Sequence, residues 1–427
     1  MNDVEDVKKA NLMGKKNLHT LDMDWECGTQ GDNVSHYAEL LEALRPHSNL
    51  KELKIRHFQG LRLPRWMTND FALSNLVKLQ FRYCHKCKEM KSLGELSSLK
   101  ELEIKRMDNL SHIGEDRHNH QVAESSTTTR TEVKGPEAAT ILYPSLEQLS
   151  VRDVPNLEEW FENSAEIFPK LQDLMLCGCP KLRYMPSHFP SLQKLTIEKV
   201  NNTDTVRSIT KNITSLTSLS FVASSSSSSE KEEEEVARML GKNKLLQILT
   251  VKGLSLMRSM PHLSPSLKKL NIRNCPALQI ESARLPCVVE SLWIDDVKAF
   301  VLDDTLWSNK LSDLYIRKVP EFVQLLVNFL RNNMHLCTIE IERCPQFEGF
   351  LSSNEEEIRS SPDSPPPPSS SSYFDSSVER LSKHIGFAIT GVCSTSIFDS
   401  HWLQGAPVIG RSAIPPQHSK LIDWQIF

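Results

Sequence analysis

The sequence predicts an α/β solenoid, in which parallel strands line a concave face and irregular loops and short helices form the convex face. The first observation is composition: leucine accounts for 54 of the 427 residues, and all but three of these leucines precede Ser352. The second is periodicity, because the pattern Leu-x-x-Leu-x-Φ, where Φ is apolar, occurs thirteen times. A unit repeated this often predicts a chain that stacks one small structural element.

The copies of this pattern are spaced as in leucine-rich repeats. Successive copies begin 21 to 47 residues apart, and most of these distances fall within the roughly 20–29 residues that are typical of such repeats. The copies begin at Leu18, Leu50, Leu76, Leu99, Leu146, Leu171, Leu192, Leu216, Leu246, Leu267, Val289, Leu311 and Leu336. We therefore predict a leucine-rich-repeat horseshoe of about thirteen irregular repeats over residues 1–351.

Each repeat is expected to contribute one short strand to a parallel β-sheet on the concave face. Within Leu-x-Φ the apolar residues alternate, so they share one face of a strand. The eighth residue after the first leucine should point inward again. In eleven repeats that residue is Phe58, Cys84, Met107, Val154, Cys179, Val200, Leu254, Cys275, Val297, Val319 or Cys344. One repeat cannot bury this apolar edge alone, whereas stacked repeats bury it between neighbours.

The segments between and after the strands are less regular. Residues 37–44 place apolar side chains on one face of a helix, which makes them the best helix candidate. Two polar insertions, near residues 113–141 and 224–235, are expected to be solvated loops. Residues 352–377 are rich in serine and proline, which is typical of a disordered linker, and residues 378–427 form a tail of undefined structure.

Composition and charge exclude several classes of protein. Only 15 glycines are present, whereas nucleotide-binding enzymes need glycine where the backbone contacts phosphate. A formal net charge of −4 argues against a nucleic-acid partner.

No apolar run reaches about 18 residues, so we expect no membrane span, and the acidic N-terminus does not resemble a signal peptide. The ten cysteines form no compact framework, so we expect a reduced protein in the cytoplasm or nucleus.

Two motifs resemble sites for chemistry without supporting one. Residues 405–412 resemble a phosphate-binding loop, but Arg411 replaces the lysine and Pro415 prevents the helix that should follow. Cys84 and Cys87 have the spacing of metal ligands but no second pair, and Cys84 occupies an inward repeat position. We therefore predict that the chain is not an enzyme and has no catalytic residues, no metal and no cofactor.

A row of basic residues is the first candidate binding surface. The position directly after Φ holds Arg56, Arg82, Lys105 and Arg152 in four consecutive repeats. Stacking would align them as a stripe on the concave face, which is the usual binding face of a repeat solenoid. Such a stripe could contact an acidic protein. The alternative is an ordinary solvated charged face.

Two aromatic residues are the second candidate. Trp293 and Tyr315 occupy the middle outward position of adjacent repeats, and Arg317 follows in the same strand as Tyr315. Neighbouring strands would bring the two rings together. Exposed aromatic residues often dominate the energy of protein interfaces. The alternative is that both rings pack beneath a loop.

Five longer stretches of the repeats are distinctive. They are Leu41-Glu-Ala-Leu-Arg-Pro-His47, Asn49-Leu-Lys-Glu-Leu53, Leu63-Pro-Arg-Trp-Met67, Tyr143-Pro-Ser-Leu-Glu-Gln-Leu149 and Pro155-Asn-Leu-Glu-Glu-Trp160. With the Cys-Pro endings at Cys179, Cys275 and Cys344, they resemble the repeat region of plant intracellular nucleotide-binding leucine-rich-repeat (NLR) disease resistance proteins of the coiled-coil type. The resemblance covers roughly residues 1–350.

This resemblance implies a protein-binding region of an immune receptor in plant defence. The implied partner is a pathogen effector, a guarded host protein or a nucleotide-binding switch domain that the repeats restrain. Such receptors carry a coiled-coil domain and an ATPase-type switch before the repeats. Neither has a counterpart here, so we carry over no nucleotide site and expect a partial or repeat-only relative of these receptors.

A second interpretation is a substrate-recognition adaptor of a ubiquitin ligase, because intracellular repeats often serve this purpose. That function needs an N-terminal F-box-like helical module, and residues 1–17 are too short to hold one. Co-purification separates the two interpretations, since a ligase scaffold among the partners favours the adaptor.

Overall fold

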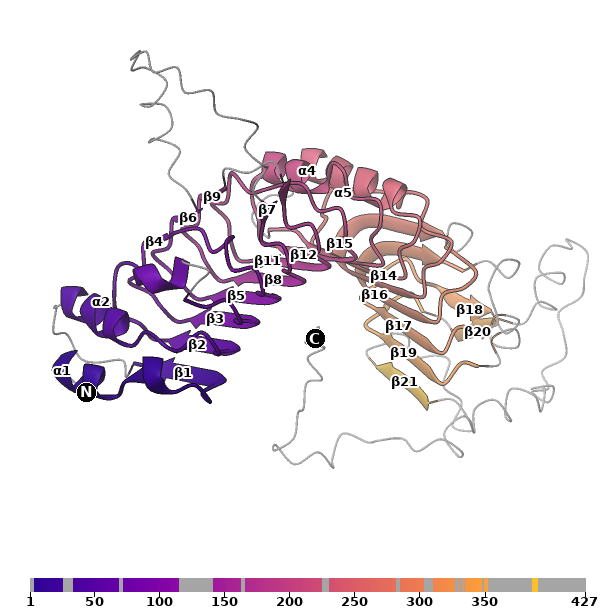
Figure 1. Cartoon of the computed structure of the whole chain (residues 1–427). Helices are drawn as coiled ribbons and strands as arrows, with labels where there is room; N and C mark the ends of the chain where they lie inside the picture. Colours follow the sequence, from indigo (N-terminus) through magenta and orange to yellow (C-terminus); the bar gives the residue numbers. More distant parts are fainter. Residues whose placement is uncertain are drawn as a thin grey trace, which may run out of the picture.

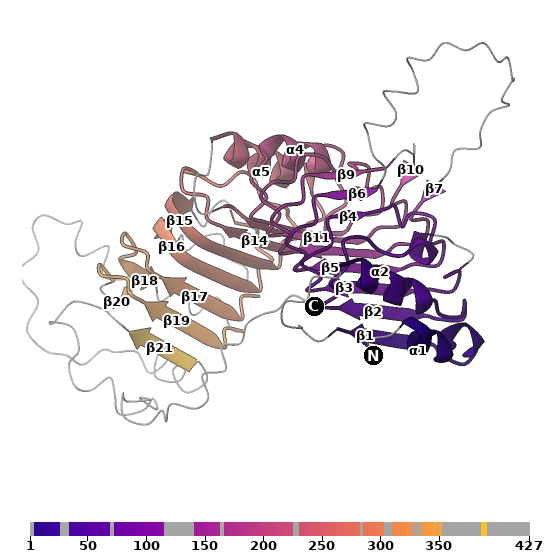
Figure 2. The ribbon, with the colours of Figure 1, turned by 90° about the vertical axis from the view of Figure 1, so that its left-hand side faces the viewer.

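A computed structural model of the chain describes residues 4–25, 34–68, 72–114, 141–162, 166–224, 230–281, 285–302, 310–326, 329, 333, 335–347, 349–351 and 386–390. These residues form an arc with a concave inner face, shown in Figures 1 and 2. One long parallel sheet lines the inner face, and helices α4 (Thr203–Thr210) and α5 (Glu230–Lys242) cover part of the outer face. The predicted α/β solenoid is confirmed.

The main sheet of the described residues has fourteen strands, which follow one another in chain order and pair only with their neighbours. They are β1 (Thr20–Asp24), β2 (Glu52–Arg56), β3 (Lys78–Arg82), β5 (Glu101–Lys105), β8 (Gln148–Arg152), β11 (Asp173–Cys177), β12 (Lys194–Glu198), β13 (Ser218–Val222), β14 (Ile248–Lys252), β15 (Lys269–Glu281), β16 (Ser291–Val301), β17 (Asp313–Arg317), β19 (Thr338–Glu342) and β21 (Gly386–Thr390). The first thirteen coincide with the thirteen copies of the leucine pattern.

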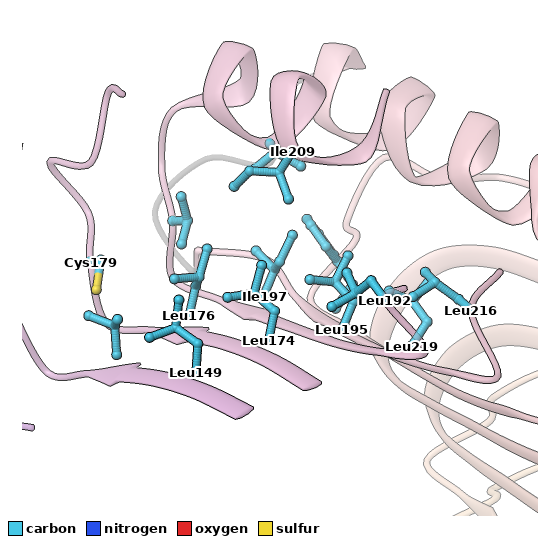
Figure 3. Packing of buried hydrophobic residues seen from close by; sticks show 14 of the residues in the cluster. Leu149, Leu174, Leu176, Cys179, Leu192, Leu195, Ile197, Ile209, Leu216 and Leu219 are labelled. Atoms are coloured by element: carbon cyan, nitrogen blue, oxygen red, sulfur yellow. The ribbon is translucent and has the colours of Figure 1, made fainter. Parts of the chain in front are cut away.

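The core lies directly behind this sheet. Strand residues alternate, so that the fourth and sixth residues of each pattern point inward, and the register aligns Leu174 with Leu195 and Leu176 with Ile197. Figure 3 shows these leucines and isoleucines packing together, with Ile209 of α4 above them. All eleven residues predicted to point inward after the strands, from Phe58 to Cys344, are buried. The stacked repeats therefore share one continuous apolar core.

Short strands also run along the side of the arc away from the main sheet. They form three small parallel sheets: β4 (Glu89–Met90), β6 (His112–Gly114) and β9 (Glu159–Phe161); β7 (Ile141–Leu142) and β10 (Glu166–Ile167); and β18 (Gln324–Leu326) and β20 (Gly349–Leu351). The sequence pattern did not predict these short ladders. Because the repeats stack at the spacing of strands, loops of adjacent repeats also come within hydrogen-bonding distance, as where Ser111 N–H donates to the Lys88 carbonyl at 3.0 Å.

The N-terminal repeats carry the other helices. They are α1 (Val4–Lys9), α2 (Val34–Ala43) and the 3-10 turns η1 (Leu12–Gly14) and η2 (Arg65–Thr68). The predicted helix at residues 37–44 corresponds to α2, in which Leu40 and Leu41 are buried. Within the described residues, no helix is both long enough and apolar enough to cross a membrane.

Helix α5 corrects the prediction of a solvated loop at residues 224–235. Residues from Glu230 onward are helical, because the sequence that follows the glutamates places Val236, Met239 and Leu240 on one buried face. The glutamates fall in the first turns of the helix, where negative charge is favourable next to the helix dipole.

The main sheet extends beyond residue 351, where we predicted that the repeats end. Strand β21 lies in the predicted tail and pairs in parallel with β19, so the sheet gains one strand. Residues 386–390 lack the leucine pattern, and Gly386-Phe-Ala-Ile-Thr390 only retains its alternation of apolar residues. The predicted linker at residues 352–377, the 115–140 part of the first insertion, and residues 405–412 lie outside the described residues.

Candidate protein-binding surface

The predicted basic residues lie side by side on the concave face. The register pairs Arg56 with Arg82, Arg82 with Lys105, and Lys105 with Arg152, at the last position of strands β2, β3, β5 and β8. We call these four residues the basic stripe. Each side chain is partly exposed, so the stripe is accessible from the hollow of the arc.

Carboxylates neutralise the first half of the basic stripe. Arg56 donates two hydrogen bonds of 3.1 Å to Asp22, and Arg82 donates one of 2.7 Å to Glu103. Both pairs are partly exposed, so each contributes little to stability. They do, however, reduce the positive charge that a partner would meet. This pairing was not predicted from the sequence.

The second half of the basic stripe remains more available. Within the described residues Lys105 forms no ion pair, and Arg152 Nε donates to the Ser150 hydroxyl at 3.0 Å. On the next strand, burial raises the pKa of the Asp173 carboxyl, although Lys194 and Arg152 act in the opposite direction. Lys105 and Arg152 are thus the two cations of the basic stripe that form no ion pair with a carboxylate among the described residues.

The predicted aromatic residues stack. The ring centroids of Trp293 and Tyr315 are 4.5 Å apart with an angle of 22° between their planes. The Arg273 guanidinium lies over the other face of Trp293, 4.5 Å from the ring centroid, and its Nε donates to Asn271 at 2.9 Å. Arg317 contacts Glu342 at 3.2 Å. Both rings are partly exposed on the concave face, so they do not pack beneath a loop.

Between the two candidate surfaces, uncharged residues occupy the middle outward position of each strand. The middle outward residues of β11 to β14 are Met175, Thr196, Ser220 and Thr250. Cys177 also faces the hollow, and burial, together with the nearby Glu198, raises the pKa of its thiol to about 12. A raised pKa disfavours the thiolate form of this cysteine.

The Cys84 and Cys87 pair belongs to the core. Both side chains are buried, and burial raises the pKa of each thiol to about 12. A metal ligand must be a thiolate, which this setting disfavours. Among the described residues, no group of three or more potential metal ligands occurs.

A second row of side chains follows the basic stripe along the rim of the sheet, and the sequence analysis missed it. His57 stacks on Tyr83 at 4.9 Å, Arg106 lies 5.3 Å from the Tyr83 ring centroid, and Arg106 approaches Asp153 at 3.6 Å. We call these four residues the rim cluster, and two of them, Arg106 and Asp153, line a hollow of about 570 Å³ that extends to Lys199.

Backbone geometry places the rim cluster. Each of its residues directly follows a main strand and has a positive φ, between 53° and 61°. The equivalent residues of later repeats include Gly178, Gly253, Asn274 and Asp296, and glycine, asparagine and aspartate tolerate this conformation best. That enrichment, two residues after Φ, is the signal that could have predicted the row.

Comparison with known proteins agrees with the repeats. Residues 1–107 match the family model described as R13L1/DRL21 LRRs. The chain is 33% identical over 208 residues to an RPP13-like disease resistance protein of Arabidopsis thaliana, covering 46% of this chain and 19% of that protein. It is 32% identical over 194 residues to disease resistance protein RGA2 of Solanum bulbocastanum, covering 45% and 19%. The chain thus spans about a fifth of the length of these relatives.

Solved structures are more distant. The crystal structure of the TLR13–ssRNA13 complex is 14% identical, with a TM-score of 0.35 over 80% of this chain and 52% of that one. The parallel sheet and its repeats form a leucine-rich-repeat solenoid. Its N-terminal repeats match the R13L1/DRL21 LRR family model, and the chain is similar to part of plant disease resistance proteins.

Proposed function

We propose that the concave face is the protein-docking surface of a plant immune receptor. It recognises a pathogen effector or a guarded host protein, or it restrains a nucleotide-binding switch domain, by binding and without chemistry of its own. The observation that carries this proposal is the alignment of the basic stripe in the hollow of the arc, with Lys105 and Arg152 left available.

The charge around the basic stripe supports an acidic partner. The outward residues of β2, β3, β5 and β8 include six cations and three carboxylates. They are Lys54, Arg56, Lys78, Arg82, Lys105 and Arg152, with Glu52, Glu101 and Glu103. A surface with this excess attracts a negatively charged partner and raises the rate of encounter, and the effect weakens with salt.

The aromatic pair supports a second anchor point on the same face. Trp293 and Tyr315 are large, partly exposed and held by Arg273, so binding a partner would cost them little side-chain entropy.

An intracellular location, in the cytoplasm or nucleus, agrees with the eight described cysteines, which are all free thiols.

Co-precipitation from plant leaf tissue, with quantitative mass spectrometry, tests this function. The double variant Lys105→Glu/Arg152→Glu should recover an acidic partner about tenfold less well than the wild type, corresponding to about 1.4 kcal/mol. The control is Lys211→Glu/Lys244→Glu, which makes the same charge change at exposed residues outside the concave strands. It should leave recovery unchanged.

The aromatic pair provides a separate arm of the test. Trp293→Ala/Tyr315→Ala should weaken partner recovery yet leave thermal unfolding nearly unchanged, because both rings are partly exposed. The proposal fails if neither double variant alters recovery of any partner. Recovery of a ubiquitin-ligase scaffold as the main partner would instead support the adaptor function.

A further inference from the structure

Three side chains form a continuous stack near the C-terminal end of the concave face. The Arg273 Cζ of β15 lies 4.5 Å from the ring centroid of Trp293 of β16, and that centroid lies 4.5 Å from the ring centroid of Tyr315 of β17. Trp293 and Tyr315 are register partners, whereas Arg273 lies two residues beyond Asn271, the register partner of Trp293. This interval is close to the spacing of about 4.8 Å between strands. The stack therefore advances by one member per strand, and its next position lies over β19.

Glu340 occupies β19 at that position. The register pairs Tyr315 with Glu340, and the Glu340 charge contributes to raising the pKa of the Tyr315 hydroxyl, after burial and Asp313. In the part of the chain that the structure describes, Glu340 forms no hydrogen bond and no ion pair. One face of Tyr315 is stacked on Trp293. On its other side lies strand β19, where Thr338 hydrogen-bonds with the Tyr315 hydroxyl and Glu340 is the register partner of Tyr315.

The surroundings of the stack are acidic, unlike the basic stripe. At the register-paired positions of β16, β17 and β19 (291–295, 313–317 and 338–342), the outward residues include four carboxylates and one cation. They are Asp295, Asp313, Glu340 and Glu342, with Arg317. Arg317 already pairs with Glu342 at 3.2 Å, so it does not compensate for Glu340. The two ends of the concave face thus carry opposite charge.

We propose that this end of the face binds an arginine side chain of a protein partner. The guanidinium stacks on the open face of Tyr315 and pairs with the Glu340 carboxylate. Arg273 already makes the equivalent contact on the far side of Trp293, so a bound arginine would complete a symmetrical cation–aromatic–aromatic–cation stack. A planar guanidinium suits this position better than an ammonium group does. The inference rests on the proposed function, because it specifies the chemistry of a partner of the concave face.

Titration of the full chain with short peptides tests the inference. The probes are acetylated, amidated tetra-arginine, tetra-lysine and tetra-glutamate. The readout is the indole N–H signal of Trp293, assigned with a Trp293→Phe variant and observed with nitrogen-15-labelled tryptophan. Tetra-arginine should shift this signal in a saturable manner, tetra-lysine should bind about twofold more weakly, and tetra-glutamate should leave it unchanged.

Matched variants locate the site. Glu340→Gln should weaken tetra-arginine binding about three- to fivefold, whereas Glu95→Gln, the same change at an exposed residue of an early repeat, should not alter it. The inference is overturned if Glu340→Gln binds as well as the wild type, or if tetra-glutamate shifts the Trp293 signal. This readout uses no natural partner, so its failure is distinguishable from failure of the co-precipitation test.

Discussion

At the scale of the residue, the most constrained backbone position is the one two residues after Φ, where the chain turns away from the concave sheet. Gly253 and Lys318 are examples: each has a positive φ, and each N–H extends the sheet ladder by donating to the next strand, at 3.0 Å to the Arg273 carbonyl and 2.9 Å to the Glu342 carbonyl. Most repeats place an ordinary L-residue in this conformation, which costs about 1–2 kcal/mol per residue. The ladder hydrogen bond and the buried residue that follows offset this cost.

Two glycine substitutions should therefore have opposite effects. Gly253→Ala should lower the free energy of unfolding by about 1 kcal/mol, because alanine disfavours a φ of 82° even though the new Cβ would only touch Ala223 at 3.5 Å. Gly241→Ala, in helix α5 with no atom within 4 Å of the new Cβ, should raise it by about 0.5–1 kcal/mol. Urea denaturation measures both, and effects of the same sign would contradict the backbone argument.

At the scale of the element, helix α5 depends on one buried carboxylate. Glu235 is 2% exposed and accepts hydrogen bonds from Thr210 at 2.7 Å, from Arg207 at 3.3 Å and from Arg238. Burial raises its pKa, but the bonds from Arg238, Thr210 and Arg207 outweigh this effect, so the pKa is lowered overall. The carboxylate thus fastens α5 to α4.

Replacing this carboxylate should give a pH-dependent loss of stability. Glu235→Gln should lower the free energy of unfolding at pH 7 by about 1–3 kcal/mol, because buried donors lose a charged acceptor. Since the folded pKa lies below the unfolded value, the contribution of Glu235 is present above the unfolded pKa and is lost as pH falls through the folded pKa. The difference between variant and wild type should therefore shrink on acidification below about pH 4.5.

The neighbouring glutamate provides the control for this measurement. Glu234→Gln makes the same change on the exposed side of α5 and should alter stability by less than about 0.5 kcal/mol. Chemical denaturation at several pH values measures both variants. A pH-independent difference for Glu235→Gln, or an equal loss for Glu234→Gln, would show that the ion pairs do not fasten the helix.

Strands could be predicted from the sequence more completely than helices or side-chain pairs. Leu174 and Leu176 follow a local alternation that needs no knowledge of neighbours, and stacking then fixes the alignment of Arg82 with Lys105. Helix α5 has a local signal, because Val236, Met239 and Leu240 share one face, but the run of glutamates before it resembled a loop. The contacts of Glu235 with Arg207 and Thr210 join residues 28 and 25 positions apart, and no local pattern contains them.

At the scale of the whole molecule, the main sheet is a linear array. Each strand contacts only the strands before and after it, so stability is expected to be a sum of repeat and nearest-neighbour terms. The concave face is organised along the same axis, with cations toward β2 and carboxylates toward β19. A partner that used both ends would need the arc to remain intact between them.

Truncation of one core side chain should therefore have different effects in the middle and at the end of the array. Leu219 of β13 is fully buried, and Leu219→Ala should cost about 2–5 kcal/mol. Because β13 joins the N-terminal and C-terminal halves of the sheet, the urea-unfolding transition should also become broader. Its m-value, the slope of the free energy of unfolding against urea concentration, should become smaller. Leu21 is only partly buried and lies in β1, at the end of the sheet. Leu21→Ala should therefore leave the main urea-unfolding transition nearly unchanged.

Amide hydrogen exchange locates the two effects along the chain. In Leu219→Ala, protection should fall in β12, β13 and β14 together, because each of these strands loses a well-packed neighbour. In Leu21→Ala, the loss should remain within β1 and β2. A uniform loss of protection across the sheet in both variants would mean that the arc unfolds as one cooperative unit. In that case, breaking the array in the middle could not separate the basic end of the concave face from its acidic end.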